Sequence, residues 1–174
     1  TWACGAELVI PDEDQRRDPQ RLLELIQREA VTHAFLPPAL LSILPLKQMR
    51  GVNHLITGGD VCEPEVIEHL AKQCCFHNIY GPTETTVLAT TRVFACRDNN
   101  RNLGRPIANC EVFILDEHLQ PVVEQTPGEL YIAGPGVGLG YLGNPQLNAE
   151  RFLLLDLPDG RQLRVYRTGD VGKW

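Results

Sequence analysis

The first half of the chain alternates short strand-like runs with segments whose apolar residues recur every three or four positions. This alternation is typical of a parallel sheet covered by helices, because each parallel connection needs a long crossover segment. Asp18 is expected to cap a helix that has Pro19 at its first position. The expected strands are 7–10, 32–36, 53–57 and 75–80, and the expected helices are 19–30, 39–44 and 64–73.

The pattern changes after about residue 97, where a polar Asp-Asn-Asn turn is followed by short β-like runs separated by glycine and proline. A short helix is expected to open at Asn144-Pro145 and to run to about residue 152. The predicted fold is therefore α/β: part of a parallel sheet flanked by helices over residues 1–96, then a β-rich subdomain resembling a distorted barrel over 97–174. The expected strands of this second part are 111–115, 120–123, 129–133 and 162–166.

Charge and composition narrow the class of function. The net charge is −6, and no cluster of Lys and Arg covers a face, which argues against a nucleic-acid partner. No apolar run approaches the roughly 20 residues of a membrane-spanning helix, and no signal peptide is visible, so we expect no membrane partner and a cytoplasmic location. Six cysteines and five histidines show no zinc or redox spacing, so we expect most cysteines to be buried and the histidines to lack partners and catalytic roles.

The most informative stretch follows the expected strand 75–80 directly. In open α/β sheets, ligands bind beyond the carboxyl ends of the strands, so the loops after residues 36, 57 and 80 should converge. Glycine lets backbone approach a ligand, hydroxyls donate to phosphate, a carboxylate can hold a cation, and an aromatic ring offers a stacking face. These properties suit a nucleotide, although a plain strand-to-helix turn would also explain the string alone. The residues are Asn78-Ile79-Tyr80-Gly81-Pro82-Thr83-Glu84-Thr85-Thr86.

Five further segments accompany this stretch in a fixed order along the chain. They are Ile56-Thr57-Gly58-Gly59-Asp60, Leu103-Gly104-Arg105-Pro106-Ile107, Gly128-Glu129-Leu130-Tyr131-Ile132-Ala133-Gly134, Gly140-Tyr141-Leu142 and Tyr166-Arg167-Thr168-Gly169-Asp170. Together these motifs resemble the adenylation domains of nonribosomal peptide synthetases, which are adenylate-forming enzymes. The resemblance implies an internal fragment of the N-terminal core, without the family's phosphate loop or its C-terminal lid lysine.

The resemblance also implies a reaction and the residues that serve it. Such a domain uses ATP and Mg²⁺ to form an aminoacyl-AMP, and then loads the phosphopantetheine thiol of a peptidyl carrier protein domain. By family analogy Tyr80 lies against the adenine and Asp170 accepts the ribose hydroxyls. Thr83 contacts the phosphates and Glu84 holds the metal ion, so both are expected to be catalytic. The other implied cofactor-binding residues are Gly58, Gly59, Asp60, Asn78 and Gly81.

The same resemblance assigns a substrate pocket to apolar positions. A wall without hydrogen-bonding partners rejects polar side chains, whose groups would be buried unpaired. We therefore expect a hydrophobic amino acid as substrate, and an aliphatic one because the ring of Phe35 occupies volume. The implied pocket residues are Phe35, Ile56, Gly58, Ile79, Val87 and Leu88.

Several positions near the other motifs are interpreted as structural. Tyr141 and the glycines at alternate positions from 134 to 140 suit close packing, and Leu139 stands where the family commonly has Arg. Lys173 is expected on the surface. Two alternatives stay open: another adenylate-forming ligase, such as an acyl-CoA synthetase, or a noncatalytic nucleotide-binding or scaffolding fragment. We expect the chain to be inactive without the remainder of the adenylation domain.

Overall fold

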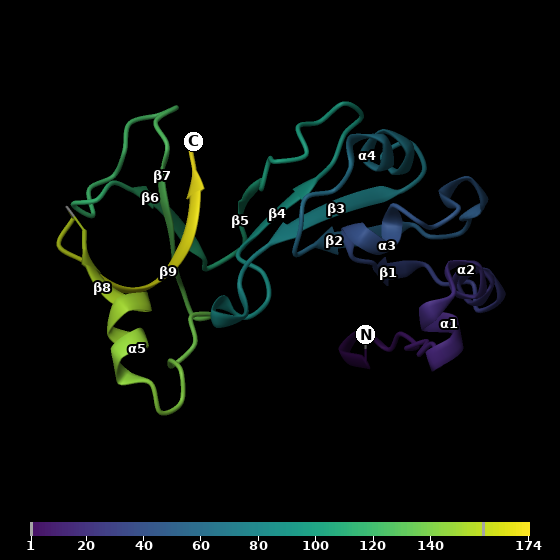
Figure 1. Cartoon of the computed structure of the whole chain (residues 1–174), viewed down its shortest axis with the longest axis horizontal. Coiled ribbons are helices and arrows are strands. Elements are labelled where there is room, and N and C mark those ends of the chain that lie inside the picture. The colour runs from purple at the N-terminus through teal and green to yellow at the C-terminus, as the bar shows by residue number, and fades with distance from the viewer. Residues whose placement is uncertain (1, 158) are drawn as a thin grey trace. The chain divides into compact units, whose positions relative to one another are not determined.

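The structure is a computed structural model that describes residues 2–157 and 159–174. It separates into two compact units. The first unit comprises Thr1–Asn78 and Arg92–Asn102, and the second comprises Ile79–Thr91 and Leu103–Trp174. Figure 1 shows the mixture of helices, a sheet with parallel strands and a separate antiparallel sheet, which confirms the predicted α/β fold class. The predicted boundary between an α/β segment (1–96) and a β-rich segment (97–174) of a larger core stays a prediction.

Strands β1 to β5 belong to one five-stranded sheet. Its strand order is β1-β2-β3-β4-β5, and β1 pairs with β2 in parallel, with His33 opposite His54 and Phe35 opposite Ile56. The boundary between the units crosses β3 and β4, so Tyr80 at the end of β3 belongs to the second unit. The strands are β1 (His33–Phe35), β2 (His54–Gly58), β3 (Cys75–Tyr80), β4 (Thr90–Val93) and β5 (Arg105–Pro106).

The strands predicted at 32–36, 53–57 and 75–80 are thus confirmed, and β4 and β5 were not predicted. The strand predicted at 7–10 is wrong, because these residues have no regular secondary structure. Val9 instead packs as a partly buried side chain against the core of the first unit. The apolar side chain of Val9 therefore reflects packing against the core and not membership of a β-strand.

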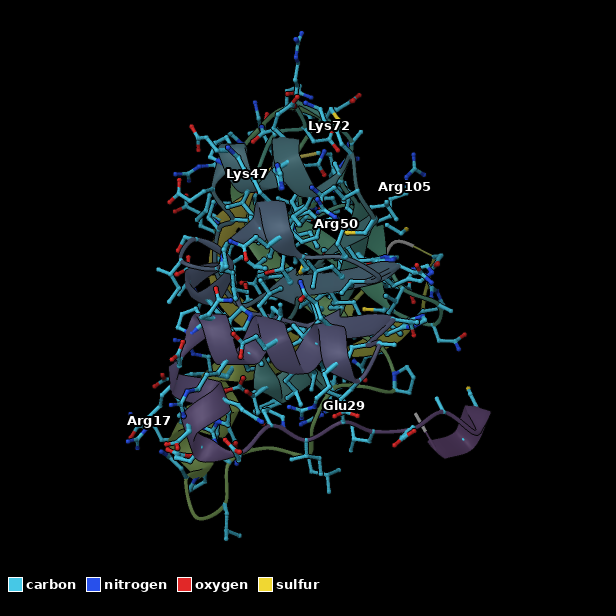
Figure 2. All side chains as sticks on the ribbon, turned by 90° about the vertical axis from the view of Figure 1, so that its right-hand side faces the viewer. Arg17, Glu29, Lys47, Arg50, Lys72 and Arg105 are labelled. Carbon is cyan, nitrogen blue, oxygen red and sulfur yellow. The ribbon has the colours of Figure 1, made fainter. Side chains whose placement is uncertain are left out.

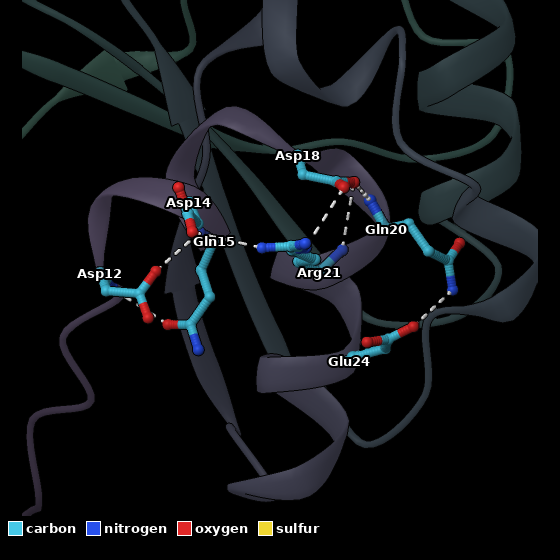
Figure 3. Close-up of polar contacts among 7 residues, drawn as sticks. All are labelled: Asp12, Asp14, Gln15, Asp18, Gln20, Arg21 and Glu24. Atoms are coloured by element: carbon cyan, nitrogen blue, oxygen red, sulfur yellow. Dashed lines mark hydrogen bonds and ion pairs between the residues drawn. The ribbon is translucent and has the colours of Figure 1, made fainter.

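Capping side chains fix the starts of the first two α-helices, α1 (Glu13–Arg17) and α2 (Pro19–Arg28) (Figure 3). Asp12 accepts a hydrogen bond from the Gln15 backbone N–H at 2.8 Å, and the Gln15 side chain accepts one from the Asp12 N–H at 3.0 Å. This reciprocal capping box explains α1, which the sequence analysis missed. Asp18 caps α2 as predicted, by accepting from the backbone N–H of the second and third helical residues.

The helices of the first unit share one apolar core with the sheet. Leu55 on β2 and Phe76 on β3 are fully buried, together with apolar side chains of α2, α3 (Pro38–Leu41) and α4 (Pro64–Leu70). Both α3 and α4 end earlier than predicted. Charged side chains extend into solvent from this unit, as Arg17, Lys47 and Lys72 do in Figure 2. Two short 3-10 helices, η1 (Trp2–Cys4) and η2 (Leu46–Gln48), complete the unit.

The opposite face of this sheet carries histidines that contact one another. The rings of His33 and His54 stack with centroids 4.7 Å apart, and those of His54 and His77 with centroids 5.5 Å apart. The expectation that the histidines lack partners is therefore wrong for these three, because adjacent strands bring distant residues together. It is also wrong for His69, which contacts Gln73, and for His118, which lies 3.6 Å from Glu117. The expectation of mostly buried cysteines is also wrong: all six are free, and of these only Cys62 is buried.

The second unit is built on an antiparallel sheet of order β6-β7-β9-β8. The strands are β6 (Glu111–Leu115), β7 (Gly128–Ala133), β8 (Phe152–Asp156) and β9 (Gln162–Gly172), preceded by η3 (Thr83–Thr85) and joined by α5 (Pro145–Arg151). Asn144 caps α5 by accepting from the Leu147 backbone N–H at 3.1 Å, which confirms the predicted helix start.

Three of the strands predicted for this part are confirmed, and β9 extends further than expected. The strand predicted at 120–123 is wrong: Pro121 makes one isolated bridge to Leu115. Asp116 accepts from the backbone N–H groups of His118 and Gln120, so the chain turns here instead of pairing. Strand β8 was not predicted. Across the described ranges 2–157 and 159–174, no helix is both long enough and apolar enough to cross a bilayer.

Candidate functional site

A hydrogen bond across 90 positions of sequence joins two of the predicted site residues within the second unit. The Tyr80 hydroxyl, at the end of β3, donates to Oδ2 of Asp170 on β9 at 2.5 Å. Burial raises the pKa of Tyr80 above its ordinary value, and the bond to Asp170 raises it further, so the hydroxyl keeps its proton at neutral pH. The other carboxylate oxygen of Asp170 gives this exposed group further capacity to accept hydrogen bonds.

A second polar chain links the η3 turn to the same strand β9. The Tyr141 hydroxyl donates to Oε1 of Glu84 at 2.5 Å and lies 3.2 Å from the hydroxyl of Tyr166. The hydrogen bond from Tyr141 holds the pKa of Glu84 below its ordinary value, so Glu84 is ionised at neutral pH. Glu84 and Tyr80 are therefore both connected to β9, through Tyr166 and Asp170 respectively.

The sequence analysis expected a packing role for Tyr141 and missed its contact with Glu84. Its position after a glycine-rich segment indicated packing, and its ring does contact Phe152 edge-on, with centroids 5.5 Å apart. Its hydroxyl, however, contacts the Glu84 carboxylate. A buried tyrosine hydroxyl usually has a hydrogen-bond partner, and Glu84 is an acidic residue in another of the motifs. This combination could have suggested the pair.

The glycine-rich segment 134–140 lies directly against the η3 turn. The Gly138 N–H donates to the Glu84 carbonyl at 2.8 Å, and the Thr86 hydroxyl donates to the Gly136 carbonyl at 2.7 Å. A side chain at Gly136 would meet the Thr85 carbonyl oxygen at 2.9 Å. Small residues are thus required for close packing here, as the sequence analysis expected.

Arg164 on β9 holds the far side of this segment. Its guanidinium donates to the carbonyls of Gly138 at 2.6 Å and Leu139 at 2.9 Å, and it lies over the ring of Phe152 at 4.7 Å. The Leu139 side chain itself is exposed. Planar guanidinium groups suit this combined stacking and double donation. The segment that supports Glu84 is therefore fixed from both sides.

The turn after Glu84 adopts a backbone conformation that is costly for its residues. Thr86 and Val87 have φ values of 60° and 73°, in the left-handed region that β-branched residues rarely occupy. Val87 is nevertheless 65% exposed, so burial of its side chain does not offset this strain. Gly81 before the turn approaches the Leu88 and Ala89 backbone so closely that a Cβ there would lie 2.7 Å from both.

The remaining predicted site residues divide between the two units. Ile79, Tyr80, Gly81, Thr83, Glu84, Val87, Leu88 and Asp170 belong to the second unit, and Phe35, Ile56, Gly58, Gly59, Asp60 and Asn78 to the first. In the second unit the Thr83 side chain is exposed on the η3 turn beside Glu84. In the first unit Phe35 is 56% exposed, and the Asn78 side chain donates to the Asn102 carbonyl. Lys173 is exposed, as predicted.

The second unit thus presents an ionised carboxylate, an exposed hydroxyl, a protonated tyrosine and an exposed aspartate on contacting segments. A carboxylate such as Glu84 is the type of hard oxygen ligand that Mg²⁺ takes, commonly with waters and phosphate oxygens completing the shell. Asp170 has the geometry to accept from two neighbouring hydroxyls. This donor and acceptor set fits a nucleotide phosphate with its cation.

Comparison with known proteins decides the family. Residues 1–142 match the model of the family described as AMP-binding enzymes. The chain belongs to this family. Its relatives include a linear gramicidin synthase of Brevibacillus parabrevis, 40% identical over 98% of this chain, and surfactin synthase subunit 2 of Bacillus subtilis, 38% identical over all of it. The resemblance to nonribosomal peptide synthetase adenylation domains is thereby confirmed.

Similar solved structures agree with this assignment. PA1221, a nonribosomal peptide synthetase protein containing adenylation and carrier (PCP) domains, matches with a TM-score of 0.83 and 30% identity over 90% of this chain. The Klebsiella oxytoca NpsA N-terminal subdomain, in complex with 3-hydroxyanthranilyl-AMSN, matches with a TM-score of 0.78 and 27% identity over 97%. The chain spans 2% and 5% of the two synthases, and 29% and 42% of the chains of the two solved structures.

Proposed function

We propose that this chain is part of an amino-acid-activating adenylation domain, which forms an aminoacyl-AMP from ATP and loads it onto a peptidyl carrier protein domain. The observation that carries the proposal is the convergence on β9 of Tyr80 and Glu84, from one motif, with Asp170 and Tyr166, from another. Distant motifs gathered by polar contacts are what a shared ligand requires. Relatives named as peptide synthetases support the same reaction class.

In this proposal each residue of the second unit acts on one part of the nucleotide. Tyr80 lies against the adenine, and Asp170 accepts the ribose hydroxyls. Thr83 donates its hydroxyl to a phosphate, and Glu84 ligates Mg²⁺, an ion that neutralises phosphate charge when bound. The Tyr141 hydroxyl positions Glu84 and keeps it ionised, which supports the metal-ligand role. Gly58, Gly59, Asp60, Asn78 and Gly81 are proposed to complete the nucleotide site.

The proposed substrate is a hydrophobic amino acid. The pocket positions inferred from the motifs carry no charged or hydrogen-bonding side chain, and Phe35 and Val87 are among the exposed apolar residues of the chain. A polar substrate side chain buried there unpaired would lose about 1–3 kcal/mol per group. The proposed pocket is Phe35, Ile56, Gly58, Ile79, Val87 and Leu88.

The proposed partners are the remainder of the adenylation domain and a carrier protein domain, in the cytoplasm. Support for the carrier comes from PA1221, whose name states that it contains both adenylation and PCP domains. We further propose that residues 1–96 and 97–174 are segments of two subdomains of one adenylate-forming core, and that this chain alone does not turn over.

The test is ATP–pyrophosphate exchange by the intact adenylation domain that carries this sequence, with a panel of amino acids. We expect exchange with valine, isoleucine or leucine, and at least about tenfold weaker ATP binding after Asp170→Asn, because a charged hydrogen bond contributes about 1.5–3 kcal/mol. Asp156→Asn on β8 is the matched control. Strong selection of aspartate, lysine or glutamine would refute the pocket. Exchange by the isolated chain would refute the proposed inactivity.

A further inference from the structure

A cluster of metal-binding side chains lies in the first unit, on the sheet face opposite the apolar core. One candidate ligand atom from each of His54, Cys75 and His77 lies within 4.8 Å of the other two. Nδ1 of His54 and Nε2 of His77 are 3.2 Å apart. All three side chains are half-buried, so they are neither sealed in the core nor loosely solvated.

We propose that His54, Cys75 and His77 form a binding site for a borderline divalent transition-metal ion such as Zn²⁺, with two imidazole nitrogens and one thiolate as ligands. The site is independent of the adenylation function proposed above. Three protein ligands leave the fourth tetrahedral position open for water or another small ligand. The sulfur ligand makes the site selective for softer ions over Mg²⁺, which prefers oxygen.

The spacing of the two nitrogens fits this geometry. Zinc–nitrogen bonds of about 2.0–2.1 Å at a tetrahedral angle place two nitrogen ligands about 3.4 Å apart. The observed 3.2 Å between Nδ1 of His54 and Nε2 of His77, which share a hydrogen bond, is close to this separation, so metal binding would exchange that hydrogen bond for two bonds to the ion. A thiolate at about 2.3 Å from the same ion lies about 3.6 Å from each nitrogen. Side-chain rotation of Cys75 within the 4.8 Å cluster can reach this separation.

Strand geometry explains why these three residues share one face. Cys75 and His77 are two positions apart on β3, so their side chains point to the same side, while Phe76 between them is buried in the core. His54 is on the neighbouring strand β2, whose next residue Leu55 is also fully buried. The sequence spacing shows only Cys-x-His, which explains why the cluster was missed.

A neighbouring histidine restricts the orientation of one ligand ring. Ring stacking by His33 on His54, with an interplanar angle of 15°, restricts rotation of the His54 ring. Coordination through Nδ1 of His54 and Nε2 of His77 would leave Nε2–H on His54 and Nδ1–H on His77, with Cys75 bound as the thiolate.

Cys74 provides a matched control one residue away. Its thiol donates to the Leu70 carbonyl at 3.6 Å, it packs against the apolar core, and burial raises its pKa. It therefore faces away from the histidine cluster and is held as the thiol. His118 provides the histidine control, because it is exposed in the second unit.

The experiment is calorimetric titration of the chain, kept reduced, with Zn²⁺ alone and with Mg²⁺ for comparison. We expect one zinc site in the micromolar range or tighter, and no comparable magnesium site. Cys75→Ser and His77→Gln should each weaken zinc binding by at least about 10–100-fold, the loss typical even for outer-shell changes. Cys74→Ser and His118→Gln should leave it unchanged. Equal losses in the controls, or the absence of a zinc site in the native chain, would overturn the proposal.

A second measurement protects the test against variants that fail to fold. Co²⁺ bound by a thiolate in a tetrahedral site gives a charge-transfer absorption that histidine ligands alone do not give. The native chain saturated with Co²⁺ should show this absorption, and Zn²⁺ should displace it. A native chain that binds Co²⁺ without thiolate absorption would contradict the role of Cys75, whatever the stability of the variants.

Discussion

Each of the two units is stabilised internally by a different kind of interaction. The first unit has a large apolar core, to which three helices and the sheet contribute, and its helix caps act locally in sequence. In the second unit the buried apolar cluster is small, built around Leu115, Tyr131, Ala133, Leu155 and Val165. Hydrogen bonds between segments far apart in sequence, such as Tyr80 to Asp170 and Tyr141 to Glu84, supplement it.

This difference indicates how the chain divides its work. Apolar burial is tolerant of exact side-chain position and stabilises the first unit as a scaffold. Polar contacts fix particular atoms relative to one another, and they are concentrated in the second unit at the segments that carry the motifs. The strained Thr86–Val87 backbone lies in the same place. We therefore expect substitutions in the first unit to change stability most, and substitutions in the second to change ionisation and binding.

The largest effect on stability should come from removing a large side chain from the apolar core of the first unit. Phe76→Ala removes a fully buried ring that packs on Phe94 with centroids 5.4 Å apart, and should lower the free energy of unfolding by about 3–5 kcal/mol. Phe152→Ala in the second unit removes a half-buried ring and should cost clearly less. Urea unfolding of the two variants measures both losses. Equal losses would remove the contrast between the units.

Tyr141→Phe should have a smaller effect on stability and a distinct effect on ionisation. It removes the hydroxyl donor to Glu84, so the pKa of Glu84 should rise towards its ordinary value. The loss of stability should be about 1 kcal/mol, because the pair is partly exposed. NMR titration of the Glu84 carboxyl measures the pKa. Tyr131→Phe, which removes a hydroxyl bonded to Glu129, should leave Glu84 unchanged.

Alkaline pH should weaken the second unit through Tyr80. Its pKa in the folded chain lies above the ordinary value of 10.0, so this contribution to stability is complete below pH 10 and is lost as pH rises further. We expect the native chain to lose about 1 kcal/mol more than Tyr80→Phe between about pH 8 and pH 11. Urea unfolding across this range measures the difference. Identical pH profiles would show that the Tyr80–Asp170 contact contributes nothing.

The smallest effect should come from Thr57, on the buried side of β2. Among the described residues, its hydroxyl is the buried side-chain polar atom without a hydrogen-bond partner. Thr57→Val replaces it with a methyl group of the same shape and should stabilise the chain by about 1 kcal/mol or less. Thr85→Val is the matched comparison, since the Thr85 hydroxyl donates to the Pro82 carbonyl at 3.1 Å and its loss should destabilise. Thermal unfolding of both variants tests the opposite signs.

Local signals predicted much of the fold. Asp18 and Pro19 identified the start of α2, and Asn144 that of α5, because caps act within a few residues. The failures at 7–10 and 120–123 have a different cause: strand formation depends on a partner, and neither segment has the pairing that its apolar pattern suggested. Strands β4, β5 and β8 were missed for the same reason.

The sequence analysis named motif residues for the candidate site, but it did not predict the contacts between them. Motif order identified Tyr80, Glu84 and Asp170, and the structure joins Tyr80 to Asp170. Nothing local in the sequence pairs Tyr141 with Glu84, or His54 with His77, because each pair forms only when distant segments become neighbours. The sequence shows which side chains have suitable chemistry, whereas only the folded sheets show which of these side chains are neighbours.

The most direct test of the adenosine site is NMR titration of the isotopically labelled chain with AMP. We predict one saturable process in which Tyr80 and Asp170 shift together, at least about tenfold weaker after Asp170→Asn and unchanged after Asp156→Asn. AMP binding of equal strength in the Asp170→Asn chain, or shifts confined to residues away from Tyr80 and Asp170, would contradict the account.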